Sequence, residues 1–173
     1  MKQRARLGMA LFLLNEAVLF FMLIAAFVYF RSSTVATAAR SLDLEAAGIY
    51  TLCLLASSFT MWRATVTDAR GWLGGTLALG GIFLYGQGSE YWRLFRQNIT
   101  ISRNQFGTTF FTLTGVHALH VLVGLLALAF LVSGAGFRPA LRGTVVDAVA
   151  LYWYFVDAVW IAIFAVVYLW TFL

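Results

Sequence analysis

The chain has 173 residues, of which 62% are hydrophobic and only 11% charged, and its mean hydropathy is +0.86. A small soluble domain exposes much of its surface and carries about 25% charged residues, so this composition predicts an integral membrane protein instead. The formal net charge is +5, but the arginines lie between apolar runs rather than on one basic face, which excludes a nucleic-acid-binding protein. A single cysteine excludes a disulfide framework and a cysteine-based metal site.

Five stretches are long and apolar enough to form transmembrane helices, which need about 20 residues each. They are residues 7–30, 46–62, 71–92, 105–133 and 145–172. We therefore predict an all-α polytopic membrane protein, with residues 1–173 forming one transmembrane domain of five helices. The first stretch follows basic residues, as in a signal peptide, but it is too long, contains Glu16 and lacks a small-residue cleavage site. We expect it to be a retained helix.

Basic residues in the short connections predict the orientation. Seven lie on the N-terminal side, namely Lys2, Arg4, Arg6, Arg63, Arg70, Arg138 and Arg142. Five lie on the opposite side, namely Arg31, Arg40, Arg93, Arg96 and Arg103. The excess favours a cytoplasmic N-terminus and, after five crossings, an external C-terminus. The single proline, Pro139, is expected in a loop, and with Gly143 it punctuates the turn before the last helix.

Few polar residues lie inside the spans, and each is informative because a charge at the bilayer centre costs about 2.5–3.5 kcal/mol on insertion scales. Glu16 has only apolar neighbours one helical turn away. It is either a proton-linked carboxyl or a structural one that fixes helix packing, and we expect it to be protonated or hydrogen-bonded to a histidine of the fourth span.

Two histidines, His117 and His120, lie three residues apart on one face of the fourth span. They are too few for a usual metal site, which needs three or four ligands, although a haem could take one of them. We expect them instead to form interhelical hydrogen bonds, with Glu16 and Asp157 as the available carboxylate partners. Asp157 shares a face of the fifth span with Tyr154, among many aromatic residues.

The third span differs from the others in its glycines and in its polar end. Its glycines, in the stretches Gly74 to Ala78 and Gly81 to Tyr85, predict a narrow ridge that another helix can approach closely. The helix is therefore expected to be central or pressed against a partner subunit. Near its end, Glu90 is placed to pair with a basic residue three positions later, at the membrane interface.

Four segments resemble motifs of haem–copper oxidase subunit III, and they occur in the same order. Residues 8–21 (GMALFLLNEAVLFF) resemble GMALFIxSEVLFF, and residues 87–91 (QGSEY) resemble QxxEY. Residues 106–121 (FGTTFFTLTGVHALHV) are similar to YGSTFFxxTGFHGLHV, and residues 150–160 (ALYWYFVDAVW) to the closing YWHFVDVVW. The resemblance covers essentially the whole chain and is closest to the short, five-helix bacterial form.

The resemblance implies an accessory subunit of a proton-pumping respiratory terminal oxidase in the bacterial cytoplasmic membrane. Subunit III of this family carries no haem, copper or other cofactor, which are expected in the partner subunits. It packs mainly on subunit I, in a complex with subunit II, and binds phospholipids. It supports assembly, stability and proton uptake during the reduction of oxygen to water, and protects the active site from inactivation.

Several residues match the family's buried polar positions, and the match implies structural or proton-linked roles rather than catalytic ones. Glu16 matches the carbodiimide-reactive carboxyl. The other matched positions are Gln87, Glu90, His117, His120 and Asp157.

The chain also departs from the family pattern. Tyr154 stands where the family usually has histidine, and the family's WAHHS is absent after Trp62. The two helices that begin longer members have no counterpart, so we expect another subunit, or extra helices on subunit I, to take their place, or the cleft to open to bulk lipid.

Three alternatives stay open on the sequence. Subunit III of a quinol oxidase uses the same scaffold, because subunit II selects the electron donor. A five-helix accessory protein of nitric oxide reductases is related. A small proton-linked transporter would use Glu16 and the histidines as a relay, but inverted repeats and prolines within the spans are absent.

Overall fold

The computed structural model describes residues 2–30, 42–67, 70–101, 105–133 and 139–170. The helices are α1 (Lys2–Tyr29), α3 (Leu44–Thr67), α4 (Arg70–Arg96), α5 (Gln105–Ser133) and α6 (Pro139–Phe164), and α6 continues into a π-helical turn, η1 (Ala165–Leu169). Within these ranges all regular structure is helical, which confirms the predicted all-α fold.

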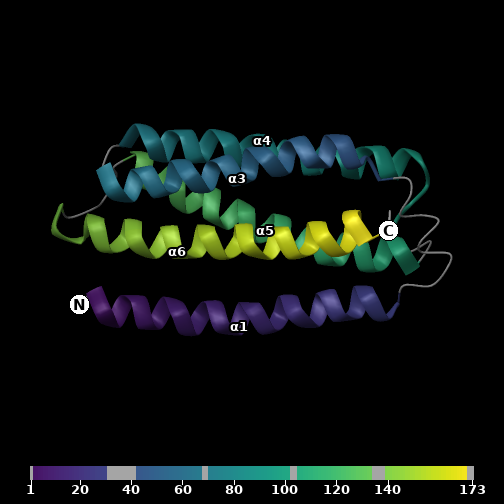
Figure 1. The fold of residues 1–173 in the computed structure, drawn as a ribbon, viewed down its shortest axis with the longest axis horizontal. Coiled ribbons are helices and arrows are strands. Elements are labelled where there is room, and N and C mark those ends of the chain that lie inside the picture. Colours follow the sequence, from purple (N-terminus) through teal and green to yellow (C-terminus); the bar gives the residue numbers. More distant parts are fainter. Residues whose placement is uncertain (1, 31–41, 68–69, 102–104, 134–138, 171–173) are drawn as a thin grey trace.

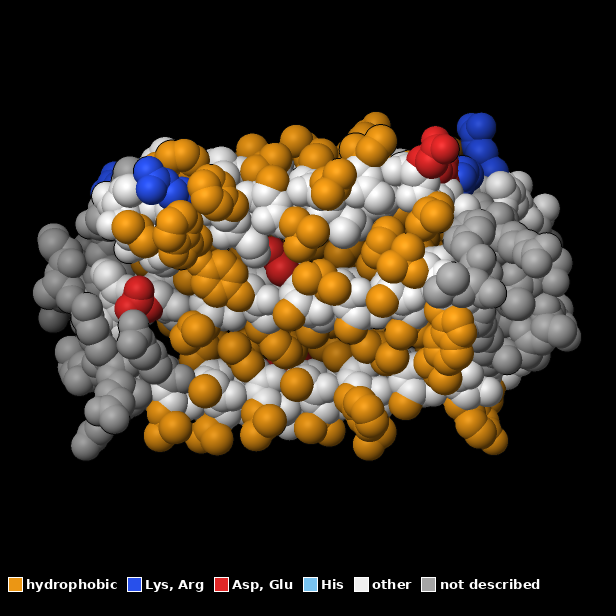
Figure 2. Space-filling model, in the orientation of Figure 1, with side chains coloured by type: hydrophobic (Ala, Val, Ile, Leu, Met, Phe, Trp, Pro, Cys, Tyr) orange, Lys and Arg blue, Asp and Glu red, His pale blue; other side chains and the backbone are white. Residues whose placement is uncertain are grey.

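Four of the helices are long and apolar enough to cross a membrane: Leu7–Tyr29, Leu44–Thr67, Gln105–Ser133 and Gly143–Leu169. The remaining helix, α4, has 27 residues, or about 40 Å, but its glycines and charged ends lower its hydropathy. Figure 2 shows apolar side chains over the middle of one face, with charged side chains towards the two ends. This distribution is that of an integral membrane protein.

The helices form three layers (Figure 1). α3 and α4 lie together on one side, α5 and α6 form the middle, and α1 lies on the opposite side against α5 and α6. Successive helices run in opposite directions, so the beginning of α1, the end of α3 and the beginning of α6 lie at the same end of the bundle. Short connections between consecutive helices favour this antiparallel arrangement.

Specific caps mark the beginning of α3 and the end of α4. Asp43 precedes α3, and its Oδ1 accepts a hydrogen bond from the backbone N–H of Ala46 at 3.0 Å, which satisfies a free donor of the first turn. α4 ends in a Schellman motif, in which the N–H of Ile99 bonds the carbonyl of Leu94 at 3.1 Å. Asn98 takes the left-handed conformation that this motif requires, with φ of 59°.

The expected turn before the last helix is partly wrong. Pro139 is the first residue of α6, and Gly143 lies inside that helix. A proline is favoured at a first helical position because its φ is already helical and its missing N–H would have had no helical partner. The other predicted connection residues fall largely in the ranges 31–41, 68–69, 102–104 and 134–138, outside the described residues.

Glycines bring the helices together around Trp153 of α6, which is fully buried. A Cβ atom at Gly80 of α4 would lie 2.7 Å from this indole ring, and one at Gly124 of α5 would lie 2.9 Å from it. On the predicted ridge, Gly74 and Gly81 have no atom of this chain within 4 Å of their Cβ positions, so a close approach there stays a prediction for a partner subunit. The close contacts of α4 lie inside this chain, against α3 and α5.

Candidate functional site

The central feature of the site is a carboxyl–imidazole pair between α1 and α5. Oε2 of Glu16 lies 3.1 Å from Nε2 of His120, which confirms the hydrogen bond expected with the fourth span. Nδ1 of His120 lies 2.8 Å from the carbonyl oxygen of Val116. Because a carbonyl can only accept, Nδ1 carries a proton, and the contact with Glu16 holds one further proton on either the carboxyl or the imidazole. The pair is thus either neutral or an ion pair.

The pair is shielded but not completely buried, since the two side chains are 14% and 15% exposed. Phe20 of α1 packs edge-on against the imidazole of His120, with ring centroids 5.0 Å apart. From α6, the hydroxyl of Tyr152 donates to the backbone carbonyl of His120 at 2.9 Å. The pair therefore joins all three helices on this side of the bundle.

A groove with a volume of about 380 Å³ lies beside the pair, between α1 and the α5–α6 layer. Its lining is almost wholly apolar and includes His120. The residues are Met9, Phe12, Leu119, His120, Val123, Ala127, Val149 and Tyr152. An apolar ligand suits such a groove, because the lining offers dispersion contacts and few hydrogen bonds.

His117 has surroundings quite different from those of His120. It is fully buried, and neither ring nitrogen has a hydrogen-bond partner among the described residues. Its ring stacks on Trp160 of α6, with centroids 5.0 Å apart, and meets Phe83 of α4 edge-on. The expected bond from His117 to a carboxylate is therefore wrong. Side chains three residues apart point in directions about 60° apart around the helix axis. This difference is enough to direct one histidine to α1 and the other to the aromatic core.

Asp157 of α6 bonds to α3 rather than to a histidine. It is only 3% exposed, and Ser58 donates a hydrogen bond to its Oδ2, while Oδ1 has no partner among the described residues. Two indoles strengthen the same helix pair, because Nε1 of Trp153 and Nε1 of Trp160 each donate to an α3 hydroxyl at 2.9 Å, on Ser57 and Thr51 respectively.

Glu90 lies in an ionic cluster near the C-terminal end of α4. Its Oε1 accepts from Nη2 of Arg93 at 2.5 Å, as predicted, and Nη1 of Arg93 lies 3.2 Å from Oδ2 of Asp43. Asp43 is not among the residues predicted for the site, although an aspartate just before a helical segment is a recognisable N-cap signal. Gln87, one turn earlier, is buried, and its Nε2 has no partner among the described residues.

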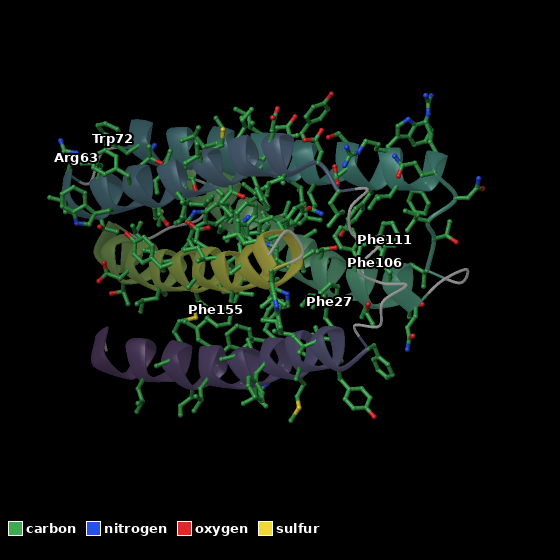
Figure 3. All side chains as sticks on the ribbon, turned by 45° about the vertical axis from the view of Figure 1, so that its right-hand side comes forward. Phe27, Arg63, Trp72, Phe106, Phe111 and Phe155 are labelled. Carbon is green, nitrogen blue, oxygen red and sulfur yellow. The ribbon has the colours of Figure 1, made fainter. Side chains whose placement is uncertain are left out.

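The positions that depart from the family pattern also have distinct surroundings. Tyr154 lines a second groove, of about 280 Å³, between α3 and α6, together with Thr65 and Asp147. At the nearby end of α3, the guanidinium of Arg63 lies 5.4 Å from the ring centroid of Trp72 (Figure 3). Among the described residues, no three His, Cys, Asp or Glu side chains gather where they could hold a metal ion.

Comparisons with known proteins agree on one family. A family model described as cytochrome c oxidase subunit III matches residues 1–172. The chain is 36% identical over 178 residues to cytochrome c oxidase subunit 3 of Corynebacterium diphtheriae, covering 93% of this chain and 85% of the relative. It is 37% identical over 177 residues to cytochrome c oxidase subunit 3 of Synechocystis sp., covering 94% and 74%. A probable cytochrome c oxidase subunit 3 of Mycobacterium leprae is 41% identical over 137 residues, covering 73% and 67%.

The family-model match extends over the helices that hold the Glu16–His120 pair, the Glu90 cluster and Asp157. They also agree with the helical, membrane-type architecture of the described residues. Membership of an oxidase subunit family implies that the chain works in a complex with other oxidase subunits. We conclude that the chain belongs to the cytochrome c oxidase subunit III family.

Proposed function

We propose that the chain is the non-catalytic subunit III of a bacterial cytochrome c oxidase and that the Glu16–His120 pair, beside its apolar groove, is its functional centre. The haem and copper that reduce oxygen to water then belong to partner subunits, with subunit I as the main neighbour and subunit II as the electron entry. This chain contributes to assembly, stability, lipid binding and proton uptake during pumping. The observation that carries the proposal is the 3.1 Å contact between Glu16 and His120.

The groove supports a lipid-binding role. Its lining comes from α1, α5 and α6, and it is apolar along almost its whole length. A phospholipid acyl chain in the groove would cover the imidazole edge of His120 and keep water from the pair. The polar lipid headgroup would then lie at the membrane interface, near an end of the bundle. Phospholipid is accordingly the ligand that we assign to this groove.

The geometry of the pair supports a proton-linked role. Val116 fixes one proton on Nδ1 of His120, so the proton shared with Glu16 is the one that can move. A carboxyl and an imidazole in direct contact share this proton, which either group can hold. The same contact fixes α1 on α5, so structural and proton-linked roles act through the same two side chains.

The charges at the bundle ends support the orientation. Arg63 and Arg70 lie at the same end of the bundle as the beginning of α1, whereas Arg93 and Arg96 lie at the other end. With the basic N-terminal residues, this favours a cytoplasmic N-terminus and an external C-terminus in the bacterial cytoplasmic membrane. In this arrangement α4 also crosses the membrane, as the third of five spans, and pairs with α3.

Two variants of Glu16 in the intact oxidase test the proposal. Glu16→Gln keeps a hydrogen-bonding side chain without the mobile proton, so initial turnover should persist while proton uptake slows or inactivation during turnover becomes faster. Glu16→Leu also removes the hydrogen bond, so less of the chain should remain in the purified complex. Asn15→Leu, at an exposed neighbour on the same helix, is the control. Unchanged assembly, proton uptake and lifetime in both Glu16 variants would refute the proposal.

The identity of the complex has a separate test. The relatives named above are cytochrome c oxidase subunits, which favours cytochrome c over quinol as the electron donor. The purified native complex should contain a subunit II with a dinuclear copper motif, and the isolated chain should show no haem absorption. A complex whose subunit II lacks that motif would instead indicate a quinol oxidase.

A further inference from the structure

One arginine near an end of the bundle is held between two indole rings. Arg63 lies one turn before the end of α3 and is half-buried. Its guanidinium carbon is 5.4 Å from the ring centroid of Trp72 on α4 and 5.9 Å from that of Trp62 on its own helix. Figure 3 shows Arg63 and Trp72 together at one end of the α3–α4 layer. At these distances cation–π attraction is favourable, and two rings restrict the long side chain to one place.

The hydrogen-bond donors of this guanidinium have no acceptor within the described part of the chain. None of the ion pairs there includes Arg63, and its one hydrogen bond is accepted by its backbone carbonyl from Thr67. Cation–π contacts do not require the N–H groups, so the planar fork of donors is available to a ligand. Such a fork matches two oxygens of a phosphate group, which also supplies the missing negative charge.

The outer side of α3 favours a phosphate that belongs to a lipid. Exposed apolar side chains form a stripe that leads to Arg63, namely Leu55, Phe59, Trp62 and Val66. Their spacing of three or four residues places them on one face of the helix, and the rings of Phe59 and Trp62 are 5.7 Å apart. An acyl chain along this stripe gains dispersion contacts, while its headgroup reaches the helix end. Tryptophan and arginine typically lie at this level, the membrane interface.

We propose that Arg63, held between Trp62 and Trp72, binds the phosphate group of an anionic phospholipid whose acyl chain lies along the stripe of α3. A zwitterionic lipid fits less well, because its headgroup brings a cation next to the guanidinium. The site lies on the α3–α4 side of the bundle, away from the groove between α1 and the α5–α6 layer. Arg63 follows Trp62 at the point where the chain departs from the family's WAHHS, so family membership does not supply this site.

A comparison of two lipids in the native complex that contains this chain tests the site. Phosphatidylglycerol with a photoreactive acyl chain, added after the complex has been delipidated in detergent, should label α3 between Leu55 and Val66. Phosphatidylcholine with the same acyl chain should label this segment at least fivefold less. Equal labelling by the two lipids, or none in this segment, overturns the proposal but leaves the proposed function intact, because that function rests on the Glu16–His120 pair.

The same labelling distinguishes a lipid from a phosphate ion. An excess of inorganic phosphate should reduce labelling by phosphatidylglycerol no more than chloride does at equal ionic strength, because the ion lacks the acyl contacts on α3. A specific loss of labelling with phosphate would assign the guanidinium to the free ion and overturn the lipid assignment.

Variants show whether Arg63 itself selects the lipid. Arg63→Gln should lower labelling by phosphatidylglycerol about fivefold, to the level of phosphatidylcholine. Arg70→Gln is the matched control, because Arg70 is exposed at the same end of the bundle and makes no ring contact among the described residues. It should change labelling by less than twofold, and equal losses in the two variants overturn the proposal.

A change in the ring tests the geometry of the site separately from its charge. Trp72→Leu keeps the arginine but removes one of the two rings that hold it, so labelling by phosphatidylglycerol should fall about two- to threefold. Unchanged labelling would mean that the charge of Arg63 acts without the indoles, and would overturn the proposed site. The comparison of the two lipids needs no variant, so it decides the proposal even if a substituted chain does not assemble.

Discussion

The two sides of the bundle are held together in different ways. Within their most apolar stretches, 44% of residues are buried in Gly143–Leu169 but only 11% in Leu7–Tyr29 of α1. α6 is joined to α3 by indole and carboxylate hydrogen bonds and packs on glycines of α4 and α5. α1 meets α5 through the Glu16–His120 pair, with an open groove beside it.

This difference shows where a membrane subunit can place a ligand. Lipid is as apolar as leucine, so burial alone does not drive helices together, and association depends on close packing and interhelical hydrogen bonds. The α3–α4–α6 side has both and can act as a rigid scaffold. The α1 side has an interhelical hydrogen bond but lacks close packing. This leaves space for the proposed phospholipid beside the Glu16–His120 pair.

The largest expected effect is in the tightly packed half, where a single added methyl group should destabilise the chain. In Gly80→Ala the new Cβ would lie 2.7 Å from the Trp153 ring and 2.9 Å from Leu125. Overpacking of this kind costs about 1–3 kcal/mol, measured as the free energy of unfolding in detergent micelles. Gly81→Ala, with no atom within 4 Å of its Cβ position, is the control and should be neutral or slightly stabilising. Similar values for both would contradict the packing described for Trp153.

Removing the Glu16–His120 hydrogen bond, in the loosely packed half, should lower the free energy of unfolding by a smaller amount. A double-mutant cycle with Glu16→Leu and His120→Leu should give a coupling energy of about 0.6–1.7 kcal/mol, the range for interhelical hydrogen bonds in membranes. The same unfolding titration measures all four proteins of the cycle. A repeat of the cycle with Asn15→Leu in place of the Glu16 change should give a coupling near zero, and a coupling near zero at Glu16 would mean that the contact adds no stability.

Parts of this comparison could be predicted from the sequence. The Glu16–His120 bond could be predicted, because a carboxyl in the middle of a span needs a partner and only two histidines lie in the spans. The Glu90–Arg93 pair follows from its spacing along one helix, which does not depend on the other helices. Local geometry and the scarcity of polar partners were sufficient in both cases.

The remaining features depend on how each helix is rotated against its neighbours. The spacing of His117 and His120 places them near one face, but only the packed bundle decides that His117 meets Trp160. Glycine spacing likewise indicates a close approach without showing that Gly80, rather than Gly81, faces a ring. Pro139 is equally compatible with a loop and with a first helical position, so sequence alone could not locate the start of α6.

A modest effect is expected from removing one buried hydroxyl on the tightly packed side. Thr51→Val keeps the shape but leaves Nε1 of Trp160 without the acceptor now 2.9 Å away. We expect a loss of about 0.6 kcal/mol in the free energy of unfolding. Thr112→Val is the control, because that hydroxyl is exposed and bonds a carbonyl of its own helix. A loss at Thr112 equal to that at Thr51 would show that the interhelical bond is not responsible.

The smallest effect on stability should come from enlarging a side chain in the groove. Ala127→Leu adds more volume than Gly80→Ala, but the new side chain projects into a groove of about 380 Å³. The free energy of unfolding should therefore change by less than about 0.5 kcal/mol. Bound phospholipid, counted by native mass spectrometry of the complex, should nevertheless decrease, because the added side chain occupies the space assigned to an acyl chain. Ala129→Leu, exposed on the same helix outside the groove, should leave the lipid count unchanged. If both variants retained the same amount of lipid, the groove beside α1 would not be a lipid-binding site. The two sides of the bundle would then differ only in how closely their helices pack.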